Sequence, residues 1–163
     1  MKNVIITLLI IVIESSLLIS CALSPTEDQT EADREAVART VSSCIGWFKD
    51  KDFDLLFSVV ANDSNYVSVR PSGTVLRGFD EFVKSAEIFK NPEFTYVRHE
   101  LKDLTINFSR SGDVAWFYCI LDDINDWGGQ PANWENARWT GVLEKRDSRW
   151  VIVQQHFSFA SDD

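Results

Sequence analysis

The sequence predicts an α+β fold in which a strongly bent antiparallel sheet packs over about three N-terminal helices. The first observation is the order of elements: two helical segments, a short strand pair, a third helix, and then four strands. The second is the stretch 135–158, where β-branched and aromatic residues flank the polar turn Arg146-Asp147-Ser148, a pattern typical of a closing hairpin. The length of 163 residues suits a single domain.

The N-terminus has the layout of a bacterial lipoprotein signal peptide. A positive start at Lys2 precedes an apolar run over 4–13, which is shorter than the ~20 residues of a membrane-spanning helix. Leu18-Ile19-Ser20-Cys21 resembles a lipobox, although Glu14 is a departure from the pattern. We expect residues 1–20 to be removed, Cys21 to be lipidated, and the protein to be anchored to a membrane of the bacterial envelope, on its periplasmic or extracellular face. The alternatives are an uncleaved anchor and an ordinary signal with an unrelated cysteine.

The remaining chain divides into a tether and a domain. Residues 21–32 are polar and predict a tether, because such a segment buries too little apolar surface to become ordered. The domain is expected over 33–160. Its first helix begins near Thr30, its second covers 53–60, and its third covers 80–89.

Six strands are expected after or between these helices. A short pair covers 66–70 and 74–77, and two long strands cover 95–109 and 113–123. The segment 125–133 contains two glycines and a proline, and it predicts a loop before the closing hairpin.

Composition excludes some functions and leaves others open. The net charge of −9 and the lack of a basic patch argue against nucleic acid as a partner. His99 and His156 are the only histidines, and no cluster has metal-ligand spacing, so neither a metal nor a cofactor is predicted. Asp122, Asp123 and Asp126 form either a weak cation site or, as we favour, a solvated strand end.

Two further features carry alternatives. Six Trp and eleven Phe indicate either a core filled by bulky side chains or an aromatic-lined cavity. Cys44 and Cys119 lie within apolar patterns and are predicted to be buried free thiols, with a disulfide in an oxidising compartment as the alternative.

The closing hairpin resembles that of the nuclear-transport-factor-2-like superfamily, in its SnoaL-like branch. The pattern is carried by Arg138, Thr140, Trp150, His156 and Ser158. Three shorter motifs agree in order and spacing: Lys51-Asp52-Phe53-Asp54, Gly78-Phe79-Asp80-Glu81 and Gly112-Asp113-Val114-Ala115-Trp116. The resemblance extends from about residue 33 to 159. It implies a cone-shaped sheet with a pocket at its wide end, in a family of isomerases, dehydratases, cyclases and non-catalytic assembly domains.

The resemblance also implies which residues face the pocket. The expected pocket residues are Ser68, Trp116, Tyr118, Trp139, Gln155 and Phe157. For Trp139 and Phe157, plain core packing is an equal alternative. A three-residue hairpin loop would place Arg138 opposite His156, whereas a two-residue loop would separate them. Arg138 and His156 are expected on the outer face, in a homodimer interface, or otherwise on a polar pocket wall that binds an anionic ligand.

The catalytic pattern of a well-known relative is not expected. Ketosteroid isomerase uses an aspartate base with a tyrosine and a protonated aspartic acid, and the resemblance places Ser68, Cys44 and Thr140 at those positions. We therefore predict a homodimer that binds a small, partly apolar ligand without catalysis. The alternatives are a lyase, isomerase or cyclase acting on a cyclic or polyketide-like substrate through a different acid–base pair, and a dimeric scaffold whose cone is filled.

Overall fold

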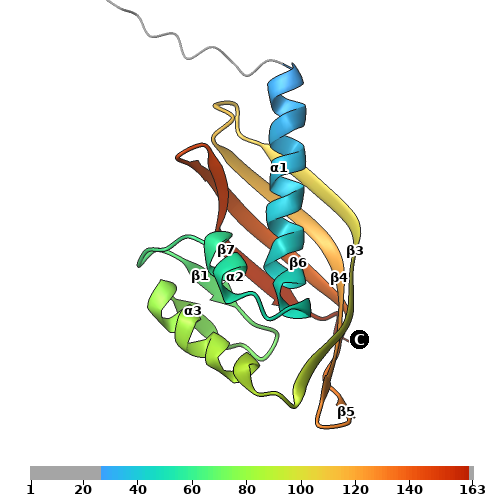
Figure 1. The fold of residues 1–163 in the computed structure, drawn as a ribbon. Coiled ribbons are helices and arrows are strands. Elements are labelled where there is room, and N and C mark those ends of the chain that lie inside the picture. The colour runs from blue at the N-terminus through green and yellow to red at the C-terminus, as the bar shows by residue number, and fades with distance from the viewer. Residues whose placement is uncertain (1–26, 162–163) are drawn as a thin grey trace, which may run out of the picture.

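The computed structural model describes residues 27–161. Three α-helices and two short 3-10 helices precede or interrupt a seven-stranded sheet (Figure 1). The helical elements are α1 (Glu27–Gly46), η1 (Trp47–Lys49), α2 (Phe53–Ser58), α3 (Phe79–Ala86) and η2 (Glu87–Lys90). The strands are β1 (Val67–Val69), β2 (Val75–Arg77), β3 (Phe94–Phe108), β4 (Val114–Trp127), β5 (Gln130–Pro131), β6 (Trp134–Arg146) and β7 (Arg149–Ser158).

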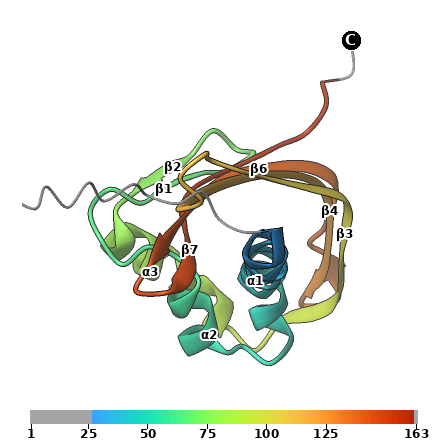
Figure 2. The ribbon, with the colours of Figure 1, turned by 90° about the horizontal axis from the view of Figure 1, so that it is seen from above.

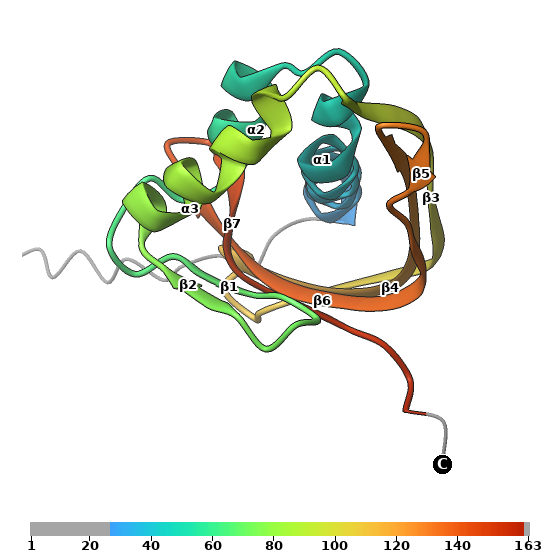
Figure 3. The same cartoon turned by 90° about the horizontal axis from the view of Figure 1, so that it is seen from below.

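The sheet has the order β2-β1-β7-β6-β4-β3, with β5 paired to β4. It curls around α1, while α2 and α3 lie across the opening (Figures 2 and 3). This confirms the predicted α+β cone. The sheet is mixed rather than purely antiparallel, because β1 pairs with β7 in parallel. A parallel pair needs a long crossover, and the chain from β2 to β6 supplies it.

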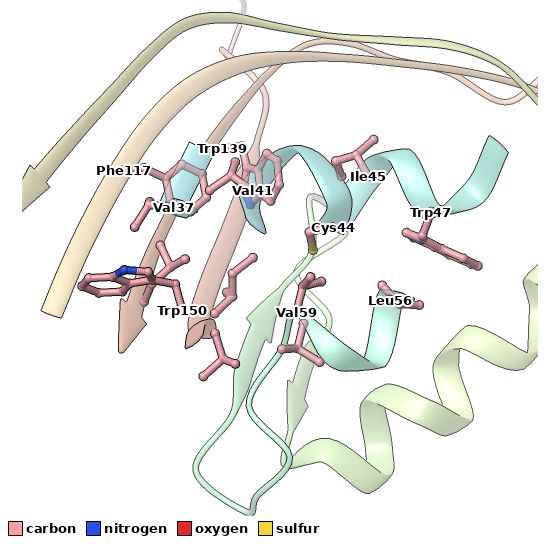
Figure 4. Close-up of a cluster of buried hydrophobic side chains, with 14 of the residues drawn as sticks. Val37, Val41, Cys44, Ile45, Trp47, Leu56, Val59, Phe117, Trp139 and Trp150 are labelled. Atoms are coloured by element: carbon pink, nitrogen blue, oxygen red, sulfur yellow. The ribbon is translucent and has the colours of Figure 1, made fainter. Parts of the chain in front are cut away.

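Helix α1 packs its apolar face against the inner side of the sheet. Val37 and Val41 are fully buried there, beside Phe117, Trp139 and Trp150 of the sheet (Figure 4). The helix begins at Glu27, so residues 27–32, which we expected in the tether, are helical. The signal peptide, Cys21 and the rest of the tether lie outside the described residues. Within residues 27–161, no helix is long and apolar enough to cross a membrane.

A buried carboxylate fixes the N-terminal half of α1 to the hairpin. Asp33 is only 8% exposed, and it accepts hydrogen bonds from Lys145 Nζ at 2.7 and 2.9 Å and from Trp150 Nε1 at 2.9 Å. Such a carboxylate is stabilised by its charged and neutral donors together, because burial alone would disfavour it.

Strand ends differ from the sequence prediction in two places. β4 continues to Trp127 and pairs with β5, so only Gly128, Gly129, Ala132 and Asn133 of the expected long loop lie outside strands. The closing turn has two residues, Asp147 and Ser148, both with positive φ (48° and 64°), rather than three. Positive φ at both positions matches the tight hairpin turn whose twist suits the flanking strands.

Candidate functional site: a cavity at the wide end of the cone

The wide end of the curled sheet contains a cavity of about 260 Å³. It lies between the C-terminal end of α1, α3 and η2, and the inner faces of β1, β4, β6 and β7. Its apolar lining residues are Cys44, Ile45, Trp47, Phe48, Leu56, Phe82, Ala86, Ile88, Phe89, Phe94, Ala132, Trp134 and Phe157. Its polar lining residues are Ser68, Arg70, Asp123, Asn125 and Gln155. The space suits a small molecule, and a mainly apolar wall with several aromatic side chains and few polar groups is typical of ligand sites.

A neutral hydrogen-bond network on the wall joins β7 to α1 and to the residue that precedes β1. Gln155 is 3% exposed; its Nε2 donates to the hydroxyl of Tyr66 at 2.6 Å, and its Oε1 accepts from Cys44 Sγ at 3.7 Å. Burial raises the pKa of Cys44 to about 12 and raises that of Tyr66 well above its usual value. Both groups therefore stay protonated at neutral pH. Ser68 lies beside Gln155 in the β1–β7 pair and is 2% exposed.

Arg70 adds a positive charge on the same wall. Its Nη2 donates to Ser85 Oγ at 3.0 Å, and burial lowers its pKa from the usual value. Among the described residues, Arg70 forms no ion pair with a carboxylate.

Asp123 on β4 is the one carboxylic acid among the described residues that line the cavity. Burial raises the pKa of its carboxyl to about 6, against the smaller lowering effect of a hydrogen bond with the Asn125 side chain. Asp123 Oδ1 is buried and accepts no hydrogen bond within residues 27–161, and the same is true of Asn125 Oδ1. A carboxyl of this kind is a functional-site candidate, because it is both desolvated and able to titrate near neutral pH.

The three aspartates that we treated as one cluster have separate roles. Asp122 accepts from the Asn136 amide at 2.8 Å and from Lys102 Nζ at 3.0 Å, and these bonds hold its pKa below the usual range. Asp126 accepts from the Gly129 amide at 2.8 Å. Across residues 27–161, no group of three or more His, Cys, Asp or Glu residues is placed to hold a metal ion. The solvated-end interpretation is wrong for Asp122, which is only 8% exposed, and for Asp123, whose Oδ1 is buried.

The signal for Asp123 was present in the sequence. Side chains alternate along a strand, so Asp123 shares a face with Phe117, Cys119 and Leu121, all of which are buried. Continuing that alternation along β4 would have directed Asp123 inward.

Some of the expected pocket residues line the cavity, whereas others lie in the core or on the outer face of the sheet. Ser68, Gln155 and Phe157 lie on the cavity wall, where contact with a ligand remains a prediction. Trp139 does not line the cavity; it is fully buried and stacks on Phe157 with ring centroids 5.1 Å apart.

Trp116 and Tyr118 do not line the cavity, in contrast to our expectation. They are 46% and 41% exposed, on the outer face of the sheet, because Phe117 and Cys119 occupy the inner face of β4. The free, buried state of Cys44 and Cys119 agrees with the interpretation that we favoured.

Arg138 and His156 also lie on the outer face, and neither lines the cavity. His156 is opposite Thr140, and Arg138 is opposite Ser158, so the two are not directly paired. The Arg138 guanidinium donates instead to the backbone carbonyl of Phe159.

The chain thus has a cone-shaped α+β fold, in which a curled sheet encloses a helix and a cavity lies at the wide end. The family model of the SnoaL-like domain matches residues 37–162, and the chain belongs to this family. No curated protein matches the chain.

Solved structures share the fold at low sequence identity. A proposed dehydratase of the NTF2-like family from Streptomyces avermitilis is 23% identical, with a TM-score of 0.69 over 80% of this chain and 98% of that one. An NTF2-like protein of unknown function from Pseudomonas putida is 17% identical, with a TM-score of 0.64 over 81% and 89%. The association domain of CaMKII from C. elegans is 16% identical, with a TM-score of 0.61 over 81% and 99%.

Proposed function

We propose that the cavity binds a small, partly apolar molecule and that the protein does not transform it. The observation that carries this proposal is the cavity itself: about 260 Å³ with aromatic walls and polar groups at two separate places. Apolar walls supply affinity and a few fixed polar groups supply orientation. A scaffold with a filled cone would lack such a space.

Catalysis is the second candidate, and Asp123 is the reason to retain it. A carboxyl with a pKa of about 6 can both donate and accept a proton near neutral pH. His99 is its neighbour across the β3–β4 pair, and burial lowers the pKa of His99. His99 does not line the cavity, however, and its Nδ1 lies 3.0 Å from the Tyr96 hydroxyl. A lyase or isomerase would need a second group beside the substrate, so binding alone is favoured.

Native mass spectrometry of the chain from residue 22 onward, purified from its own host, tests the binding proposal. A retained mass that disappears on denaturation is expected. Ala86→Leu should abolish it, because Ala86 is buried and its side chain lines the cavity. Ala32→Leu, at an exposed position of α1, is the matched control. A wild-type protein that retains no mass, and gains none from a metabolite extract, would contradict the proposal.

If a ligand is identified, Asp123→Asn separates binding from catalysis. A binding protein should release the ligand unchanged from both proteins after long incubation. Conversion of the ligand by the wild-type protein but not by the variant would establish the enzyme instead.

We also propose that two copies pair through the outer face of the sheet. Trp116 and Tyr118 are exposed there beside Thr140 and His156, a mixture of apolar and polar groups typical of an interface. The similarity to association domains supports this. Sedimentation should show a dimer that becomes a monomer in the double variant Trp116→Ser/Tyr118→Ser, with thermal stability otherwise retained. Val97→Ser, which changes another exposed apolar residue, should leave the dimer intact.

The site of action that we propose is the cell envelope, with the domain anchored through a lipid on Cys21. The support is the sequence that precedes this cysteine. Cys21→Ser should move the protein out of the membrane fraction. An unchanged membrane fraction, with the signal peptide still present, would indicate an uncleaved anchor.

A further inference from the structure

We propose that the ligand carries a protonated amine and that Asp123 and Asn125 bind this group at the β4 end of the cavity. This inference rests on the proposed binding function and specifies the chemical class of the ligand.

The first argument is the pair of acceptors without donors. Asn125 is 5% exposed, and the Oδ1 atoms of both Asn125 and Asp123 are buried without a hydrogen bond in the described part of the chain. Leaving a buried acceptor unpaired is costly. The two residues lie two positions apart on the same face of β4, about 7 Å along the strand. An ammonium group has three donors and no acceptor, so it can satisfy both oxygens from a position between them.

The second argument is charge. Within residues 27–161, Asp123 forms no ion pair, and its pKa is shifted by burial and by Asn125 alone. The titratable neighbour on β3 is His99, whose lowered pKa leaves it neutral near pH 7. A cationic ligand would therefore supply the missing counter-charge of a buried carboxylate, which a neutral ligand would not.

The third argument is the wall around these oxygens. Trp134 of β6 lies directly across from Asp123, and its ring packs on Phe157 with centroids 5.1 Å apart. Phe94 lines the same cavity and packs on Trp127 at 4.9 Å. Aromatic faces attract ammonium groups and also accommodate an apolar body.

Arg70 explains why the amine belongs at the β4 end. Arg70 directly follows β1, and β7 and β6 lie between β1 and β4 in the sheet. Arg70 and the Asp123 strand are therefore three strand spacings apart, at about 4.8 Å each. Arg70 is accordingly absent from the groups that shift the pKa of Asp123. The cavity thus has a negative end and a positive end, and the negative end has the unpaired acceptors.

Three matched probes test this inference: 2-phenylethylammonium, 2-phenylethanol and 3-phenylpropanoate, each titrated calorimetrically into the chain from residue 22 onward at about pH 7.5. The ammonium should bind at least about tenfold more tightly than the alcohol, because a hydrogen bond to a charged group is the stronger one. The carboxylate should bind more weakly than the ammonium, because only the ammonium can donate to the acceptors at the β4 end. Asp123→Asn should remove the preference for the ammonium, because the affinity for the ammonium should fall much further than the affinity for the alcohol.

Asp147→Asn is the matched control, because it removes the same charge at an exposed position of the closing turn that does not line the cavity. It should retain the preference. Equal affinities of the ammonium and the alcohol would overturn the inference and leave the proposed binding function intact. An equal loss of all three probes in Asp123→Asn would also overturn it, since that result indicates a structural role. Two results together would contradict both the proposed binding function and the preference for an amine. These results are that none of the three probes binds to the wild-type protein, and that the Ala86→Leu variant retains the same co-purified masses as the wild-type protein.

Discussion

Asp123→Asn should make the protein more stable at neutral pH and should lose this advantage in acid. The folded state raises the pKa of Asp123 from 3.8 to about 6, so it holds a proton more tightly than the unfolded chain does. Stability then falls as the pH rises through this range, because the unfolded state gives up its proton first. Each pKa unit corresponds to about 1.4 kcal/mol, so the full cost of ionising this carboxyl is about 3 kcal/mol. Asparagine has the shape of the protonated acid and avoids this cost.

Urea unfolding of the wild-type protein and the variant at about pH 4.5 and 7.5 measures the effect. The stability advantage of the variant is its free energy of unfolding minus that of the wild-type protein. Linkage predicts that this advantage grows by about 2 kcal/mol between pH 4.5 and pH 7.5. The contributions of all other titrating groups cancel in this comparison, because both proteins contain the same groups. Asp122→Asn should show the opposite sign, because the lowered pKa of Asp122 contributes stability that is present at neutral pH and is lost in acid. A difference between wild type and Asp123→Asn that does not vary with pH would refute the assignment of Asp123 as a desolvated carboxyl without an ion pair.

Two further predictions concern packing and a buried ion pair. Gly141→Ala should destabilise the protein by about 1–3 kcal/mol or more, because the added carbon would lie 2.5 Å from an aromatic ring and 2.8 Å from a backbone carbonyl. Gly141 does not have a positive φ, so the loss would be steric rather than backbone strain, and a loss below about 1 kcal/mol would contradict the steric argument. Asp33→Ala should cost about 3–5 kcal/mol in urea unfolding, because it leaves Lys145 and the indole of Trp150 without their acceptor. A loss below about 1 kcal/mol would show that solvent replaces these bonds.

The sequence was sufficient to predict the order of elements, but not to predict which side chains of β4 point to the inner face of the sheet. Residues 114–121 are apolar throughout, so both faces of this strand have a hydrophobic pattern. Alternation gives two sets of residues without saying which set is inside. The resemblance directed Trp116 and Tyr118 inward, and packing around α1 directed Phe117 and Cys119 inward instead.

The register of the closing hairpin depends on two irregularities that composition does not reveal. The turn is one residue shorter than expected, and a bulge follows where Val142 pairs with Gln154 but Leu143 pairs with Ile152. Each shift moves the pairing by one residue, and together they move it by two. His156 therefore keeps the face on which we placed it, while its partner across the hairpin becomes Thr140. Neither Asp147 nor Ser148 is a glycine, so the usual sequence signal of such a turn is missing.

The cavity owes its acidic end to a similar irregularity in β6. Leu121 pairs with Ala137 but Asp123 pairs with Trp134, so β6 contains one extra residue there, and Asn136 has a positive φ of 53°. Asp122 holds this bulge by accepting from the Asn136 amide. The bulge turns Trp134 inward, across from Asp123. Two consecutive aspartates thus have opposite electrostatic roles: the first stays charged because backbone and lysine donors stabilise it, and the second has an elevated pKa because the wall that the first helps to build excludes water from it.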